Sequence, residues 1–208
     1  MKDRKKVEKI IEILDNLYPT PHCSLTYDTP FQLLVATRLS AQCTDARVNI
    51  VTPRLFSRFP DAESFRDADI EEIEALIRST GFFREKASSI KAFSAILADS
   101  YGGMLPKTQE ELTALPGVGR KTANLVLWEV YGIPGLVIDT HAKRLAYRLG
   151  LTKNTDPYRV EKDLEPLIPK PVQTLFCHRL IHHGRAVCDA RKPKCEVCAL
   201  KEYCTYGK

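Results

Sequence analysis

Apolar residues recur along this chain at intervals of three and four positions, which is the spacing of one face of a helix. Near the N-terminus they form a stripe that ends at the prolines of "YPTPHC". The members of this stripe are Val7, Ile10, Ile11, Leu14 and Leu17. Similar stripes predict helices over about residues 30–40, 45–59, 70–79, 84–101, 109–115, 121–131, 139–149, 158–168 and 172–187. No convincing run alternates polar and apolar residues as a half-buried strand does. The pattern therefore predicts an all-α protein whose helices are joined by short connections.

Composition and charge narrow the class of protein. No apolar run approaches the roughly 20 residues that span a bilayer, and the basic N-terminus lacks the apolar core of a signal peptide. A cytoplasmic protein without a membrane segment is therefore expected. The net charge is +5, from 31 basic and 26 acidic residues, but it is unevenly spread. Residues 177–208 hold seven Lys or Arg against three Asp or Glu, whereas residues 61–74 hold one Arg against seven acidic residues. The C-terminal end is thus the one suited to face a polyanion.

The segment "LPGVGRKTA", residues 115–123, predicts a tight turn between two helices. Pro116 stops the first helix, the glycines permit a reversal of the chain, and the second helix begins near Arg120. The first N–H groups of a helix lack helical partners and carry the positive end of its dipole, so the turn suits a phosphate. The spacing is not that of a Walker A loop, and a plain helix–helix turn is the alternative interpretation.

Two further residues add chemistry to this turn. Lys121 lies in the first turn of the second helix, where a positive charge is unfavourable and its presence therefore needs a reason. Asp139 follows in "VIDTHAKR", at another predicted helix start. A neutral lysine amine beside a carboxylate that moves protons suits nucleophilic chemistry, and one helix and a turn back would bring the two side chains to one cleft. The simpler interpretation of Asp139 is a helix N-cap.

Four of the seven cysteines are gathered near the C-terminus. They are Cys188, Cys195, Cys198 and Cys204. Thiolates at this density predict a metal centre, and their spacing alone leaves an iron–sulfur cluster and a structural zinc both open. The loop between the first two cysteines carries Arg191, Lys192 and Lys194, so the centre would present a basic finger outward.

The remaining cysteines and a pair of histidines predict packing and not metal binding. Cys23, Cys43 and Cys177 are scattered among apolar neighbours, which indicates small buried side chains. His178 and His182 lie four residues apart on a predicted helix and would fit one ion, but packed or solvated histidines are the expectation there.

The hairpin, the "VIDTHAKR" segment and the cysteine tail, in this order, resemble the endonuclease III family of DNA glycosylases and abasic-site lyases. "LSAQCTD" at residues 39–45 and "GFFREKA" at residues 81–87 resemble further segments of that family, so the likeness covers nearly the whole chain. It implies an all-α helix-hairpin-helix DNA glycosylase fold, with two helical domains and a DNA-binding cleft between them. One domain, a six-helix barrel that includes the hairpin, would span residues 23–133. The other, the iron–sulfur cluster domain, would combine residues 1–22 and 134–208.

The resemblance also implies roles for individual residues. Lys121 would be the catalytic nucleophile, Asp139 would assist it, and the four C-terminal cysteines would hold a [4Fe–4S] cluster. Gln42 would fill the gap left by an extruded base, and Phe82, where the family often has leucine, would act as a wedge on the opposite strand. The full set of expected DNA contacts is Gln42, Phe82, Gly117, Val118, Gly119, Thr122, His141, Arg144, Arg191 and Lys192.

Together these features predict a bifunctional enzyme of base-excision repair. It would remove oxidised pyrimidines from duplex DNA and cleave the abasic strand by β-elimination, and the lysine is what makes the lyase step credible. The expected partner is double-stranded DNA that contains damaged bases or abasic sites. The protein is expected to be a monomer, cytoplasmic and associated with the nucleoid.

Three alternatives stay open on the sequence. A monofunctional mismatch-specific glycosylase of the same fold would typically lack the lysine. A non-catalytic helix-hairpin-helix DNA-binding protein would need neither Lys121 nor Asp139. A structural or adaptor protein with a zinc tail would lack the visible absorption of an iron–sulfur cluster.

Overall fold

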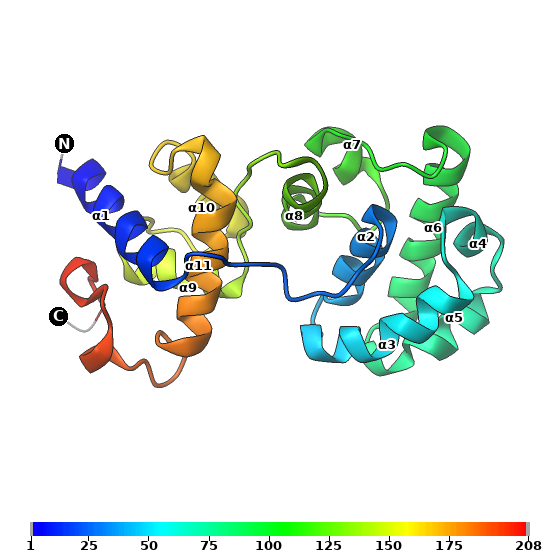
Figure 1. Ribbon diagram of the computed structural model, residues 1–208, viewed down its shortest axis with the longest axis horizontal. Helices are drawn as coiled ribbons and strands as arrows, with labels where there is room; N and C mark the ends of the chain where they lie inside the picture. Colours follow the sequence, from blue (N-terminus) through cyan, green and yellow to red (C-terminus); the bar gives the residue numbers. More distant parts are fainter. Residues whose placement is uncertain (1, 207–208) are drawn as a thin grey trace. The chain divides into compact units, whose positions relative to one another are not determined.

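The computed structural model describes residues 2–206, with side chains from Arg4 onward, and these residues form helices, turns and connecting segments (Figure 1). The all-α prediction is therefore confirmed for the described part of the chain. The chain divides into two compact units. The continuous unit is Ser24–Gly132, and the split unit joins the residues up to Cys23 to those from Ile133 onward. No helix in the described residues is long and apolar enough to cross a bilayer.

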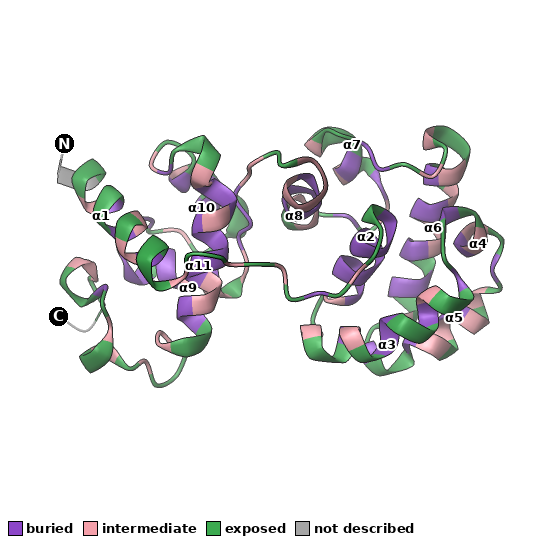
Figure 2. Cartoon of the chain, viewed as in Figure 1, coloured by how far each residue is buried: buried purple, intermediate pink, exposed green. Residues whose placement is uncertain are grey.

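The continuous unit is built around one helix that is buried on all sides. Its helices are α2 (Pro30–Leu39), α3 (Asp45–Arg58), α4 (Ala62–Asp67), α5 (Ile70–Ile77), α6 (Phe83–Tyr101), α7 (Gln109–Ala114) and α8 (Arg120–Tyr131), with a 3₁₀ turn η1 (Arg78–Thr80) after α5. Every residue of α2 from Phe31 to Leu39 is buried, and α3, α6 and α8 pack against this helix (Figure 2). Phe31, Phe59, Phe65 and Phe93 add an aromatic cluster with ring centroids 5.1–6.4 Å apart. The unit therefore has a core of its own.

A buried lysine ties two connecting segments to α6. Lys86 is 1% exposed, and its Nζ donates to the carbonyl oxygens of Leu39 (2.7 Å) and Thr80 (2.8 Å). The last carbonyls of a helix have no helical donor, so the ammonium takes the place of one at the ends of α2 and η1. Burial lowers the pKa of this lysine. The segments that follow α2 and precede α6 are thereby held by the same side chain.

The split unit packs the N-terminal helix against helices from the far end of the chain. It contains α1 (Lys2–Leu17), α9 (Thr140–Arg148), α10 (Pro157–Leu164) and α11 (Gln173–Ala186), with 3₁₀ turns η2 (Lys170–Val172), η3 (Cys195–Val197) and η4 (Lys201–Tyr203). α11 packs against both α1 and α9. The N-terminal stripe is confirmed as a core face for Val7, Ile10 and Leu14, which are buried, whereas Leu17 is 46% exposed at the end of α1.

One helix, α4, lies where the apolar pattern predicts none. Its six residues are too few to show a helical repeat, and they fall within the acidic run. Asp61 begins the helix by accepting from the Ser64 N–H (2.9 Å), while the Asp61 N–H donates to the Ser64 hydroxyl (3.2 Å). This reciprocal cap stabilises a helix that is too short to be recognised by periodicity.

The burial predicted for the isolated cysteines is correct for one of the three. Cys177, on the inner face of α11, is fully buried, and burial raises the pKa of its thiol to about 12. Cys23 and Cys43 are half-buried, so their prediction is wrong. Both lie in segments between helices, where apolar neighbours in the sequence are not neighbours on a buried face.

His178 generates a prediction about stability in acid. It is a packed histidine, 5% exposed on α11, and its Nδ1 has no hydrogen-bond partner among the described residues. Burial, with a smaller contribution from the charge of His182, lowers its pKa to about 4. Below about pH 6.5 the unfolded chain therefore binds a proton that the folded chain does not bind. We expect the contribution of His178 to the free energy of unfolding to be full above this pH and about 2 kcal/mol smaller at pH 5.

Urea unfolding of the holoprotein, followed by circular dichroism between about pH 7 and pH 5, measures this slope. His178→Gln should flatten the slope relative to the native chain. His22→Gln, which removes an exposed histidine of the same unit, should change the slope less than His178→Gln does, because the charge of His22 makes only a small contribution to the lowered pKa of His178. An unchanged slope in His178→Gln would contradict the assignment.

Candidate active site and metal centre

The residues of the predicted phosphate seat form a tight turn between α7 and α8. After Leu115 the chain reverses at Gly117, whose φ of 75° lies in the left-handed region that glycine adopts without strain. The Val118 N–H donates to the Leu115 carbonyl (3.1 Å), and the Val118 side chain is buried. Gly119 is the N-cap of α8 and brings no side chain to the start of that helix. The helix-hairpin-helix geometry is therefore present.

The two glycines of the hairpin have different tasks. A Cβ on Gly117 would meet Arg38 Nε at 2.7 Å and Ser89 Cβ at 2.8 Å, so packing requires glycine there. Arg38 is buried on α2 and donates to the Ser89 hydroxyl (2.7 Å) and the Glu85 carboxylate (2.9 Å). A Cβ on Gly119 would meet nothing within 4 Å. Gly117 thus lets the hairpin pack against the core, and Gly119 leaves the solvent-facing side of the hairpin open to a ligand.

Lys121 is the second residue of α8, and its side chain is exposed. Within the continuous unit it makes no hydrogen bond or ion pair through this side chain. The first turn of α8 carries no acidic residue, so no carboxylate of that turn holds the amine. The Lys121 amine therefore lies beside the open N-terminus of α8. From there it can reach an atom close to a phosphate bound at that N-terminus.

Asp139 belongs to the split unit and is the N-cap of α9. Its Oδ1 accepts from the Ala142 N–H at 2.7 Å, so the N-cap interpretation is confirmed. The cap fixes the carboxylate and leaves Oδ2 for a further proton. The pairing of Asp139 with Lys121 of the continuous unit stays a prediction.

His141 and Arg144, two expected DNA contacts on α9, make hydrogen-bond contacts within the split unit. The Arg144 guanidinium donates to the carbonyl oxygens of Gly184 (3.1 Å) and Cys188 (3.0 Å). Its Nη2 also lies 3.1 Å from His141 Nδ1. Burial lowers the pKa of His141, against the opposing effect of the Asp139 charge. Contact of these two side chains with DNA stays a prediction, and Arg144 has a structural task that the sequence does not indicate.

Gln42 and Phe82 share an uncommon backbone conformation. Among the described residues they are the non-glycine residues with positive φ, at 53° and 48°. This left-handed conformation costs a residue with a side chain about 1 kcal/mol or more. Both side chains are exposed, Phe82 by 61%. Gln42 follows Leu39, and Phe82 follows Thr80. Lys86 binds the backbone carbonyls of Leu39 and Thr80 and so anchors both segments. Exposed side chains on a strained, anchored backbone indicate functional positions.

The four C-terminal cysteines line one cavity of about 270 Å³. All four are half-buried and form no disulfide. η3 and η4 turn the chain between them, with Cys195 at the start of η3 and Cys204 directly after η4. Burial raises the pKa of Cys198, and the other cysteines of the cavity raise it further. Four cysteines that share one cavity can serve together as thiolate ligands of a metal centre.

Arg148 fastens both ends of the cysteine segment to α9. Its Nη1 donates to Cys188 Sγ (3.2 Å) and to the Asp189 carbonyl (2.7 Å). At the other end its backbone carbonyl accepts from the Thr205 N–H (2.9 Å), and its guanidinium lies 4.2 Å from the centre of the Tyr206 ring. The sequence offers no signal for this role except an arginine on an amphipathic helix, and what that arginine binds becomes visible only in the fold.

The basic loop between the first two cysteines is shaped by Asp189. Its Oδ1 accepts from the N–H groups of Lys192 (3.1 Å) and Arg191 (2.9 Å), and these bonds lower the pKa of the carboxyl. The two cationic side chains are exposed. Their charge therefore faces solvent, as nonspecific attraction to a polyanion requires.

Two family models match the chain. Residues 35–170 match the HhH-GPD superfamily base excision DNA repair protein model, which includes the hairpin, Lys121 and Asp139. Residues 188–204 match the iron-sulfur binding domain of endonuclease III, and this match begins and ends at the outermost cysteines.

Individual relatives match over nearly the whole length. The chain is 54% identical to an endonuclease III from Synechocystis sp., over 97% of this chain and 92% of the relative. It is 40% identical to an endonuclease III from Bacillus subtilis, over 100% of this chain and 95% of the relative. Among solved structures it resembles a trapped endonuclease III–DNA covalent intermediate in an estranged-adenine complex, with a TM-score of 0.93 and 40% identity over 97% of this chain and 95% of that chain.

The hairpin glycines give a matched pair of substitutions. Gly117→Ala forces a Cβ against Arg38 and Ser89 at a left-handed φ, so we expect the free energy of unfolding to fall by roughly 2–4 kcal/mol. Gly119→Ala meets no atom and keeps an ordinary φ of −93°, so it should cost less than about 1 kcal/mol as an N-cap change. Gly119→Ala should instead weaken DNA binding, because its methyl group faces the open side. Thermal denaturation and DNA titration measure both effects, and equal stability of the two variants would contradict the packing assigned to Gly117.

Proposed function

Because the chain belongs to the endonuclease III family, we propose that Lys121 and Asp139 carry out its DNA chemistry. The protein is a DNA glycosylase and abasic-site lyase of base-excision repair, acts on double-stranded DNA and carries a [4Fe–4S] cluster. It removes oxidised pyrimidines and cleaves the abasic strand by β-elimination. The observation that carries the assignment is an exposed, unengaged lysine in the first turn of a helix whose start is open to a phosphate.

The lysine amine opens the reaction. In its neutral form the amine of Lys121 attacks C1′ of the damaged nucleotide, and the bond from C1′ to the base breaks. The base leaves with a proton, the sugar ring opens, and the lysine nitrogen and C1′ form an iminium. The iminium withdraws electrons from C2′, so loss of a C2′ proton expels the 3′ phosphate. Hydrolysis then frees the amine. A glycosylase that activates water needs no amine, so the lysine accounts for the strand cleavage.

Asp139 moves protons in this scheme. Its Oδ1 is occupied by the Ala142 N–H, which holds the carboxylate in one orientation. Its Oδ2 is left to take a proton from the attacking amine and to return it later. Lys121 has no carboxylate in its own helical turn, so the proton acceptor must come from another element.

We assign the hairpin to a backbone phosphate of the damaged strand. Gly119 keeps the start of α8 free of bulk, Gly117 lets the turn pack against the core, and Val118 and Thr122 complete the turn. The contact uses N–H groups and the helix dipole, which carry no sequence information. A repair enzyme needs this kind of contact, because damage arises in every sequence.

We assign Gln42 and Phe82 to the gap that an extruded nucleotide leaves in the duplex. A damaged base inside the stack is out of reach of a nucleophile, so it must be flipped out and replaced by side chains. Gln42 fills the space of the lost base, and Phe82 enters on the opposite strand. Their exposure, their strained backbone and their shared anchor at Lys86 support this assignment.

We assign the [4Fe–4S] cluster to the four cysteines that line the C-terminal cavity, Cys188, Cys195, Cys198 and Cys204. When bound, the cluster supplies a rigid frame for the cysteine segment and takes no part in bond breaking. Arg191 and Lys192 on the basic loop then add phosphate contacts whose strength falls with salt. In this proposal residues 23–133 act as the barrel domain, and residues 1–22 with 134–208 act as the cluster domain.

We further propose that the enzyme works in the cytoplasm in association with the nucleoid. Its substrate is damaged chromosomal DNA, and its positive net charge favours residence on a polyanion. Phosphate contacts without sequence information allow it to search long stretches of duplex.

Borohydride trapping tests the nucleophile. Reduction of the iminium should join the protein covalently to DNA that contains a damaged base or an abasic site. Lys121→Gln should lower the yield of this adduct by more than about 100-fold while lesion binding is retained, because the hairpin contact comes from backbone N–H groups. The matched control is Lys107→Gln, which removes another exposed lysine of the same unit and should trap like the native chain. Full trapping by Lys121→Gln would assign the nucleophile to a different amine.

Asp139→Asn separates the capping role from the chemical one. Asparagine caps a helix about as well as aspartate, so the free energy of unfolding should change by less than about 1 kcal/mol. Base removal should slow by about 10²–10⁴-fold, because the carboxylate that moves protons is gone. Single-turnover assays on a damaged duplex measure this step, and the same assays on a ready-made abasic site should retain part of their rate. Native base removal by this variant would exclude Asp139 from proton transfer.

A further inference from the structure

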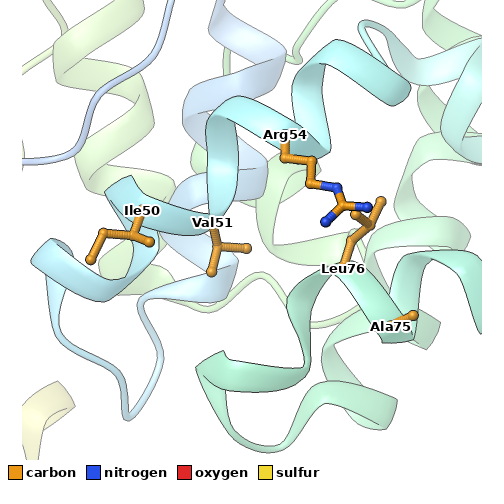
Figure 3. Close-up of a pocket in the computed structure, with 5 residues that line it drawn as sticks. All are labelled: Ile50, Val51, Arg54, Ala75 and Leu76. Carbon is orange, nitrogen blue, oxygen red and sulfur yellow. The ribbon is translucent and has the colours of Figure 1, made fainter.

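The cysteine cavity differs from a groove on the continuous unit in the polar groups that reach its lining. The groove lies between α3 and α5 and is lined by Ile50, Val51, Arg54, Ala75 and Leu76 (Figure 3). Its aliphatic side chains and its guanidinium offer no ligand atom to iron. The cysteine cavity offers four thiols, and the ring of His183 from α11 contacts one of them. A group that contacts a metal ligand can tune the metal as well as orient the ligand.

His183 contacts two of the proposed cluster ligands from a buried position. The residue is 1% exposed, and its ring Nε2 lies 3.3 Å from Cys198 Sγ. Its backbone carbonyl accepts from the Cys188 N–H (2.8 Å). The adjacent His182 is half-buried and stacks on the Tyr18 ring instead, with ring centroids 5.9 Å apart. Of these two histidines, His183 is therefore the one placed to act on a sulfur ligand.

Tyr18 fixes which ring nitrogen of His183 carries the proton. Tyr18 follows α1, and its half-buried hydroxyl lies 3.2 Å from His183 Nδ1. A cysteine that binds iron has lost its proton and can only accept, so Nε2 of His183 must donate to Cys198 Sγ. No carboxylate bonds to this ring in the described part of the chain, so the buried imidazole is neutral and carries a single N–H. Nδ1 is thus left as an acceptor, and it takes the Tyr18 O–H.

A buried hydrogen bond to a ligand sulfur favours the reduced form of an iron–sulfur cluster. Reduction adds negative charge to the cluster, and the positive end of an N–H bond stabilises that charge. The effect is strongest where burial excludes water, as it does at His183. Cys188 Sγ also receives a side-chain donor, from Arg148 Nη1 at 3.2 Å. Both α9 and α11 thus supply donors to the sulfur ligands.

We propose that Tyr18 and His183 set the reduction potential of the [4Fe–4S] cluster through the hydrogen bond from His183 to Cys198. The proposal rests on the ligand set proposed for the cluster. Tyr18 holds the ring in the tautomer that donates, and His183 brings the donor to the sulfur where water does not reach. The pair raises the potential, so the cluster is easier to reduce and harder to oxidise. Both are positioning residues, because they act on the cluster through its ligand.

Voltammetry of the iron-loaded holoprotein on a graphite electrode measures this potential. His183→Phe removes the donor and keeps a ring of similar size, so the potential should become more negative. His183→Gln places an amide N–H near the position of the ring Nε2, so its potential should stay closer to the native value. A packing role would give the opposite order, because phenylalanine fills a buried site better than glutamine does.

Two further variants complete the series. Tyr18→Phe removes the O–H that orients the imidazole, so its potential should shift in the same direction as that of His183→Phe. His22→Gln, which changes an exposed histidine of the same unit, should keep the native potential.

Two results would overturn the proposal. One is a native potential in His183→Phe or in Tyr18→Phe. The other is a larger shift in His183→Gln than in His183→Phe. If His183→Phe does not retain its iron, Tyr18→Phe decides the test, because it keeps the imidazole. Iron analysis of Cys198→Ala separates these results from a failure of the ligand assignment, which full iron content in that variant would refute.

Discussion

The buried guanidinium of Arg38 is the contact on which the hairpin depends. A charge enclosed in a protein core must have bonded partners, and Arg38 finds them in Ser89 and Glu85 on α6. The hairpin rests on this group at Gly117, where any side chain would collide with it. The position of α8, and with it Lys121, is therefore set by α2 and α6. A flexible turn could bind a phosphate, but it could not hold an amine at a constant distance from the sugar beside it.

The sequence predicts a residue's role where that role depends on residues close to it along the chain. The hairpin is specified by its proline and glycines, the helix starts by their capping residues, and the metal centre by four clustered cysteines. Asp139 shows the limit of such reasoning: an N-cap and a proton carrier call for the same residue at the same helix start, and the structure confirms the cap alone. α4 escaped prediction because a reciprocal cap at Asp61 and Ser64, and not an apolar stripe, defines it.

Residues that act through distant backbone atoms could not be predicted. Lys86 and Arg148 both donate to backbone carbonyl oxygens of other segments. Every residue type has a backbone carbonyl, so the sequence does not show which carbonyl a distant side chain binds. The left-handed backbone of Gln42 and Phe82 could not be predicted from their residue types either. The anchored loops impose this conformation, and the side chains do not. Tertiary structure creates all of these features, whereas single-helix periodicity describes only what each helix buries.

The contacts of Arg148 at both ends of the cysteine segment have a consequence for how that segment can fail. Its guanidinium binds Cys188 and Asp189 at one end, and its backbone carbonyl accepts from Thr205 at the other. A segment whose two ends are fixed to one helix closes its loop at a smaller entropy cost than a free tail does. The four cluster ligands therefore depend on one helix, so a change that displaces α9 disturbs all of them together.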